Sequence, residues 1–208
     1  MNRMTAPAPI RIEDIAAHPG FTPLAQIAGI VVDLRYAGRH NFASRVLYAG
    51  WDCAWLRREA ALGLQEAARA LAARQPGLRL LVLDALRPQR VQEAIWRDVE
   101  GSPMQHYFAH PARGSIHSFG MAVDVTLVDA AGREADMGSA FDEMNETSHS
   151  ALHAELLAAG RLTREQVARR TLLAEVMAAG GFAGITTEWW HFDHGDRDHV
   201  RTGLPRVV

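Results

Sequence analysis

The chain has a single cysteine, Cys53, among its 208 residues. A lone cysteine cannot form an internal disulfide, and it cannot by itself supply the thiolates of a Cys-type zinc site. Any metal that this protein binds must therefore be held by histidine, aspartate or glutamate side chains.

The sequence also lacks an extended basic run. Its 22 Lys and Arg residues nearly balance 24 Asp and Glu residues, which leaves a formal net charge of -2. Proteins that bind nucleic acid or an anionic membrane carry a basic patch or stripe. The charge pattern therefore favours a small molecule or peptide as the partner, with no nucleic acid and no membrane. No apolar heptad indicates an oligomeric state.

Long apolar segments are absent as well. No stretch approaches the roughly 18 to 20 consecutive apolar residues that a membrane span needs. Near the N-terminus, Glu13, Asp14 and His18 interrupt any apolar run that could serve as a signal sequence. We therefore expect a cytoplasmic protein.

The composition is that of one folded domain. Hydrophobic residues make up 48% of the chain and charged residues 22%, which is enough for one sizeable core. We expect a single domain over residues 1–208, with residues 1–25 as an N-terminal arm and residues 194–208 as a terminal loop.

Hydrophobic periodicity predicts helices and strands in irregular alternation. Apolar residues recur at helical spacing in two segments, the second of which opens on a capping box formed by Thr163 and Gln166. Pro88 is suited to the first turn of a further helix. Three short segments rich in apolar or β-branched residues indicate strands. The expected helices cover 52–75, 88–99 and 163–180, and the expected strands cover 78–85, 121–128 and 187–192.

The connections between these elements favour one fold class. At least one glycine-rich connection is too short for a crossover helix, so consecutive strands there must be antiparallel. We therefore expect an α+β domain with a mainly antiparallel central sheet flanked by helices, and a doubly wound α/β fold is the second possibility.

A histidine and an aspartate lie seven residues apart where a loop enters the strand expected at 121–128. His117 and Asp124 are ligand types that suit zinc, and Gly120 between them allows a close approach of the backbone. The same two residues could also be a polar loop histidine and an aspartate that caps or pairs with an arginine. This segment alone leaves both interpretations open.

The segment Glu188-Trp-Trp-His191 adds an imidazole and a carboxylate. Two histidines and one aspartate leave the fourth zinc position open, as a catalytic site requires, and leave Glu188 free to act on the metal-bound water. Residues three apart point to opposite faces of a regular strand. A bulge or a strand end must therefore bring Glu188 and His191 together.

Four other histidines are weaker metal candidates. His194 and His199 lie in a charged, glycine-containing segment and are expected at the surface. His149 and His153 are four residues apart, but the segment lacks the glutamate that follows the first histidine in helical zinc-protease motifs.

Asp84 and Arg87 lie where a buried strand breaks at Pro88. Polar side chains at such a position reach a cleft rather than a core. The two residues could form a mutual salt bridge or a helix-entry cap, or Arg87 could present a fixed cation to an oxyanion.

Together these segments resemble the VanX-type D-alanyl-D-alanine dipeptidases, within the lysostaphin, D-Ala-D-Ala carboxypeptidase and hedgehog-like group of zinc proteins. The similarity runs from about Asp33 to Phe192. Leu86 and Phe119 depart from the usual pattern and affect the expected substrate range. The matching segments are 33–37 with 41–42, 84–88, 115–124 (S-x-H-x-x-G-x-A-x-D), 137–142, 148–149 and 188–191 (E-x-x-H).

The resemblance implies a hedgehog/DD-peptidase-like fold and hydrolysis of D-Ala-D-Ala to two D-alanines. It implies one zinc ion per chain, held by His117, Asp124 and His191. Glu188 would be the base on the zinc-bound water, and Arg87 would stabilise the oxyanion. The residues expected to bind the substrate are Ser115, Asp142, Tyr36 and Asp84.

Two alternatives remain at this point. The chain could be a D,D-carboxypeptidase of the same zinc group that acts on longer peptidoglycan stems. It could also be a non-catalytic, zinc-stabilised binding module. A purely structural zinc site needs neither Glu188 nor Arg87, so these two residues favour an enzyme.

Overall fold

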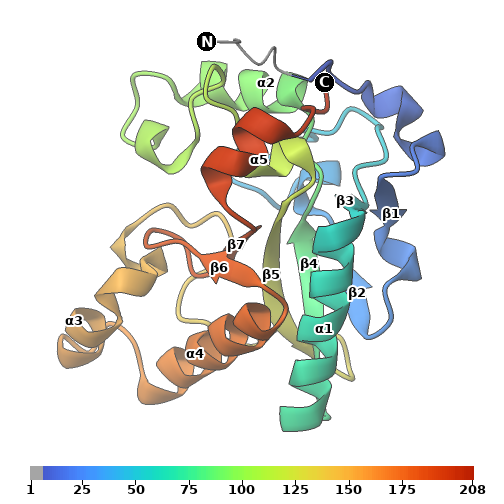
Figure 1. Ribbon diagram of the computed structural model, residues 1–208. Helices are drawn as coiled ribbons and strands as arrows, with labels where there is room; N and C mark the ends of the chain where they lie inside the picture. Colours follow the sequence, from blue (N-terminus) through green and yellow to red (C-terminus); the bar gives the residue numbers. More distant parts are fainter. Residues whose placement is uncertain (1–6) are drawn as a thin grey trace.

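A five-stranded sheet lies at the centre of the computed structural model, which describes residues 7–208 (Figure 1). Strand β2 runs parallel to β4, whereas the β4–β5, β5–β7 and β6–β7 pairs are antiparallel. The expected α+β fold with a mainly antiparallel sheet is therefore confirmed. In sheet order the strands are β2 (Ile30–Val32), β4 (Leu78–Asp84), β5 (Ala122–Asp129), β7 (His191–His194) and β6 (Phe182–Gly184).

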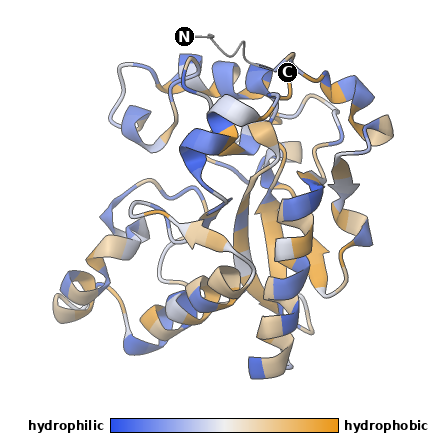
Figure 2. Ribbon diagram, in the orientation of Figure 1, coloured by the Kyte–Doolittle hydropathy of each residue, from blue (hydrophilic) through white to orange (hydrophobic). Residues whose placement is uncertain are grey.

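The two long helices pack side by side against this sheet, α1 (Arg58–Arg74) on β4 and α4 (Arg164–Ala179) on β6 (Figure 1). They approach closely because Gly63 faces Gly180. A Cβ atom on Gly63 would lie 2.3 Å from the Gly180 carbonyl oxygen, so neither position accepts a side chain. Figure 2 shows the apolar central strands behind the mixed surfaces of the helices.

The first long helix starts later than its apolar spacing predicts. Residues 55–57 form strand β3 (Trp55–Arg57), which pairs antiparallel with β1 (Phe21–Pro23) in a separate two-stranded sheet. Leu56 is fully buried in β3, so its apolar character reflects strand packing rather than a helix face. The prediction of a helix from residue 52 is therefore corrected to a start at Arg58.

The other predicted helices agree with the structure. Helix α2 (Gln89–Val99) follows Pro88, and α4 begins at the capping box, in which the Thr163 hydroxyl accepts from the Gln166 N–H. Helix α3 (His153–Ala158) was not predicted from the sequence. The short 3-10 helices are Ile12–Ala17, Leu24–Gln26, Arg35–Ala37, Gln105–Tyr107, Ile116–Phe119, Glu146–Ser148 and Ser150–Leu152.

The terminal loop expected at residues 194–208 is corrected, whereas the described residues of the expected N-terminal arm pack against the other end of the chain. Residues 1–6 lie outside the described part of the chain, but Ile12 and Ile15 are buried in an apolar cluster with Val207. Near the other end, helix α5 (Arg197–Gly203) begins at Asp196, whose carboxylate accepts from the His199 N–H. The charged residues there occupy a capped helix instead of a solvated loop.

The last strand also begins later than predicted, at His191 instead of Thr187. Residues 189–190 form a bend before it. Among residues 7–208, no helix has both the length and the apolar character needed to cross a membrane.

Candidate metal centre and active site

The sheet itself brings two of the three expected metal ligands together. Asp124 lies on β5 directly opposite His191 in the antiparallel register with β7. His117 approaches from the 3-10 helix Ile116–Phe119, which ends at Gly120 in the left-handed conformation (φ 69°). Strand β5 begins two residues after Gly120, so the turn places the His117 imidazole near the start of that strand.

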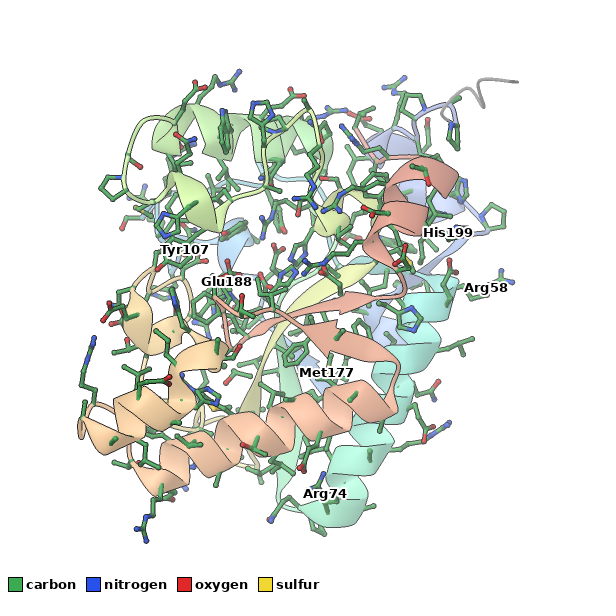
Figure 3. The ribbon with its side chains drawn as sticks, turned by 60° about the vertical axis from the view of Figure 1, so that its left-hand side comes forward. Arg58, Arg74, Tyr107, Met177, Glu188 and His199 are labelled. Atoms are coloured by element: carbon green, nitrogen blue, oxygen red, sulfur yellow. The ribbon has the colours of Figure 1, made fainter. Side chains whose placement is uncertain are left out.

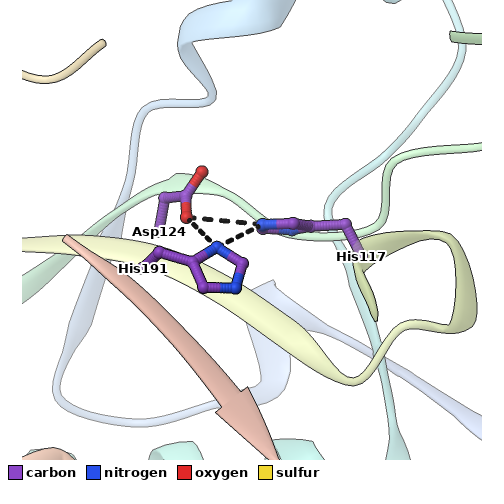
Figure 4. A group of neighbouring side chains, drawn as sticks. All are labelled: His117, Asp124 and His191. Atoms are coloured by element: carbon purple, nitrogen blue, oxygen red, sulfur yellow. Dashed lines mark hydrogen bonds and ion pairs between the residues drawn. The ribbon is translucent and has the colours of Figure 1, made fainter. Parts of the chain in front are cut away.

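The three side chains converge on one point (Figure 4). The Asp124 Oδ1 atom lies 3.0 Å from His191 Nδ1 and 3.3 Å from His117 Nε2, and the two ring nitrogens are 3.1 Å apart. Ligands about 2.0–2.1 Å from a tetrahedral zinc ion lie about 3.3 Å from one another. The donor atoms therefore fit a zinc ion with three protein ligands.

The outer ring nitrogens are fixed by hydrogen bonds. His117 Nδ1 lies 2.7 Å from the Ala85 carbonyl oxygen, and His191 Nε2 lies 2.8 Å from Asp193 Oδ1. Both acceptors require a proton on the facing nitrogen, so in the neutral rings the lone pairs of His117 Nε2 and His191 Nδ1 face the shared point. Burial opposes ionisation of Asp124, but the two imidazoles hold the pKa of its carboxyl well below the usual range.

Asp193 is a residue that the sequence analysis missed. It is buried, it orients His191, and its second oxygen accepts from Arg197. Its position two residues after His191 on the same strand places both side chains on one face, which is the signal that could have found it.

We expect Asp193→Asn to weaken zinc binding about 10- to 100-fold, because the ligand loses its charged orienting partner. Competition with a chromophoric chelator measures this affinity. The matched control is Asp198→Asn, whose side chain is 91% exposed. Equal zinc affinity in Asp193→Asn and the control would contradict the role of Asp193.

Glu188 lies outside β7, just before the bend at residues 189–190, so the alternation of faces along a strand does not apply to Glu188 and His191. Its side chain is buried next to the metal ligands, and Figure 3 shows it beside Tyr107. Burial raises the pKa of Glu188 to about 7, although the charges of His191 and Arg87 act to lower it. A bound divalent cation would act in the opposite direction and favour the carboxylate.

Arg87 forms the mutual salt bridge that the sequence left open, and its side chain also reaches the cavity wall. Its guanidinium donates to Asp84 Oδ2 from Nε (2.9 Å) and Nη2 (2.6 Å), which makes a buried salt bridge. Nη2 also lies 3.5 Å from Asp124 Oδ2, and Arg87 lines the same cavity as the three ligands. Burial lowers the pKa of Arg87, but Asp84 outweighs it and holds the pKa above its usual value.

A cavity of about 310 Å³ contains these groups. Tyr36, Ser115 and Asp142 of the expected substrate-binding set line it. Asp84 does not line it. That carboxylate lies behind Arg87, accepts from the Tyr48 hydroxyl and is fully buried.

Asp142 is a buried carboxylate at the cavity wall, held with a positive φ of 61°. Its oxygens accept from the Tyr36 hydroxyl (3.3 Å) and the Phe42 N–H (3.2 Å). Burial raises the pKa of Asp142 well above its usual value, and the charge of Asp124 adds to this effect. A ligand cation at this position would compensate the buried charge.

The other histidines remain apart from this cluster. Within residues 7–208, His117, Asp124 and His191 form the only group of three or more potential ligands with converging donor atoms. His199 is exposed, whereas His194 is half-buried against Phe182 instead of lying at the surface as expected. His149 shares a 2.9 Å hydrogen bond with the Tyr107 hydroxyl.

Comparisons with known proteins identify the family of the chain. The family model described as D-ala-D-ala dipeptidase matches residues 17–206. A D-alanyl-D-alanine dipeptidase of Escherichia coli is 37% identical over 162 residues, which cover 78% of this chain and 77% of that protein. Proteins of the same name from Streptomyces coelicolor (30% identity, 85% and 91% covered) and Enterococcus faecium (31%, 83% and 90%) also match. The chain therefore belongs to the D-ala-D-ala dipeptidase family of metallopeptidases.

Proposed function

We propose that this protein is a zinc-dependent dipeptidase that hydrolyses D-Ala-D-Ala to two D-alanines. One observation carries the proposal: a three-ligand centre opens into a cavity whose walls hold both the buried carboxylate of Glu188 and the guanidinium of Arg87. The names of the matching relatives give the substrate class.

His117, Asp124 and His191 would hold the zinc ion, which supplies Lewis acidity and lowers the pKa of water when bound. Glu188 takes a proton from the attacking water and delivers it to the leaving amine. Arg87 presents a fixed positive charge to the oxygen on which negative charge develops. Asp84 keeps the guanidinium of Arg87 in place through two hydrogen bonds.

Recognition of a free dipeptide requires a partner for each charged end. Asp142, with Tyr36 beside it, is placed to pair with the substrate ammonium, and Ser115 lies on the cavity wall as a donor to the carboxylate. An amide in place of either charged end leaves a buried polar group unpaired, which such sites reject strongly. This favours a dipeptidase over a carboxypeptidase that acts on longer stems.

The test is release of free D-alanine by the zinc-loaded protein from three substrates: D-Ala-D-Ala, L-Ala-L-Ala and N-acetyl-D-Ala-D-Ala. The proposal expects cleavage of the free D,D-dipeptide alone. Equal rates on the free and acetylated D,D-peptides would support a carboxypeptidase instead. No cleavage of any of the three would contradict the proposal.

Removal of zinc should leave a folded but inactive protein. The ligands are held by the β5–β7 register and by bonds to Ala85 and Asp193, and the main apolar core does not depend on the metal. We expect chelation to lower the melting temperature by a few degrees. A ligand that binds only the native state stabilises it, and removal of the ligand takes this contribution away. Circular dichroism during a thermal melt measures this, and unfolding on chelation would support the binding-module alternative.

A further inference from the structure

Three arginines gather on one part of the cavity wall, and the sequence analysis assigned a role to none of them. Arg197 and Arg201 are four residues apart on α5, so both side chains leave the same face of the helix. Arg113 comes from the loop that leads into Ser115. All three line the cavity that contains the metal centre.

These arginines lie close to one another and to the backbone before Ser115. Arg201 Nε donates to the Gly114 carbonyl oxygen at 3.3 Å. Burial lowers the pKa of Arg201, and the charges of Arg113 and Arg197 lower it further. Positive charge is therefore concentrated beside Ser115.

The carboxylates of the protein do not neutralise this group fully. Asp193 pairs with Arg197, but it also accepts from His191. Asp198 lies 3.8 Å from Arg201, and its side chain is 91% exposed, so this contact is weak. No carboxylate within residues 7–208 forms a salt bridge with Arg113, whose side chain is exposed.

The opposite charge lies at a different part of the same cavity. The charges that act most strongly on Asp142 are those of Asp124, Arg87 and Glu188. None of these acts strongly on Arg201, whose charged neighbours are the two other arginines and two aspartates. Asp142 and the arginines thus have different charged neighbours. The contacts Arg197–Asp193, Asp193–His191 and His191–Asp124 link the arginines to the metal-ligand group.

We propose that Arg113, supported by the charges of Arg197 and Arg201, binds the C-terminal carboxylate of the substrate. The inference rests on the proposed function and adds the charged residues that would balance the substrate's negative end, next to Ser115 and away from Asp142. The positive charge of the three arginines that the protein's own carboxylates leave unbalanced can be balanced by one substrate carboxylate. A C-terminal amide, which has no charge, gains nothing from these residues.

The experiment compares kcat/KM for D-Ala-D-Ala and for its C-terminal amide, D-Ala-D-alaninamide. Arg113 is suited to substitution because it is exposed and its side chain donates no hydrogen bond to another residue in the described range 7–208. Arg113→Gln should lower kcat/KM about tenfold on the acid, the effect of one lost bond to a charged group, and leave the amide within about twofold. Arg113→Lys should recover most of the loss, because it keeps the charge.

Arg69→Gln is the matched control, an exposed arginine on α1 whose salt bridge is with Glu66. It should change neither rate. An equal loss on acid and amide in Arg113→Gln would overturn the inference, because it would show a structural effect. No loss on the acid would overturn it as well.

Calorimetric binding of D-Ala-D-Ala separates this inference from the proposed function. If the wild-type protein hydrolyses neither substrate, the proposed function fails. The arginine site is then supported by about tenfold weaker binding of the dipeptide to Arg113→Gln than to the wild type. It is overturned by equal binding, or by no binding to either protein.

Discussion

Replacement of Glu188 by glutamine should lower kcat for D-Ala-D-Ala by about 10² to 10⁴ while zinc affinity stays nearly unchanged. Glutamine keeps the size and shape of the side chain but cannot accept a proton at neutral pH. Glu188 lies in the cavity wall outside the group of three converging ligands, so the ligand set remains intact. The loss should appear in kcat more than in KM, because proton transfer acts in the transition state.

Single-turnover kinetics with the zinc-loaded variant measures the chemical step directly. Chelator competition on the same sample confirms that the metal is bound. Glu155→Gln, an exposed residue on α3, serves as the control for charge loss alone. A Glu188→Gln protein with full zinc content and a rate within a few-fold of wild type would rule out Glu188 as the base.

The sequence was most informative where local rules and tertiary packing agree. The capping box of Thr163 and Gln166 marks the start of α4, and the apolar run over 78–84 forms β4. The metal ligands were also recognisable, because His117, Asp124 and His191 occur in two segments whose spacing matches a known pattern. Their convergence depends on the register of β5 with β7, which no local rule supplies.

The differences arise where one pattern fits two structures. The apolar residues at 55–56 fit the spacing of α1, but pairing with β1 places them in a strand. The charges of 196–201 are as compatible with a solvated loop as with a capped helix, and the cap at Asp196 decides between them. This ambiguity concealed Arg197 and Arg201, since their place in the cavity wall follows from the helix.

For Glu188, the predicted strand argued against a site that the structure does form. A strand from residue 187 would have pointed Glu188 and His191 to opposite faces, which argued against a shared site. The structure removes the conflict because β7 begins only at His191. Strand ends are set by pairing partners, and the partner of His191 is Asp124, 67 residues away.

Replacement of Arg87 by methionine should affect both stability and catalysis, and the two effects can be separated. Removal of the guanidinium leaves the fully buried Asp84 without its partner, so we expect the free energy of unfolding to fall by about 3–5 kcal/mol. Loss of the fixed cation at the developing oxyanion should lower kcat/KM for D-Ala-D-Ala about 10²- to 10³-fold. Urea unfolding and steady-state kinetics measure the two effects.

The double variant Arg87→Met with Asp84→Asn distinguishes a catalytic role from a structural one. Asparagine carries no charge, so it removes the unpaired buried carboxylate and should recover most of the lost stability. It cannot replace the guanidinium, so activity should stay low. Recovery of activity together with stability would show that Arg87 only maintains the fold around Asp84. Persistent loss of activity in a protein as stable as the wild type would place the Arg87 cation in the reaction itself, because lost stability could then no longer explain the lost activity.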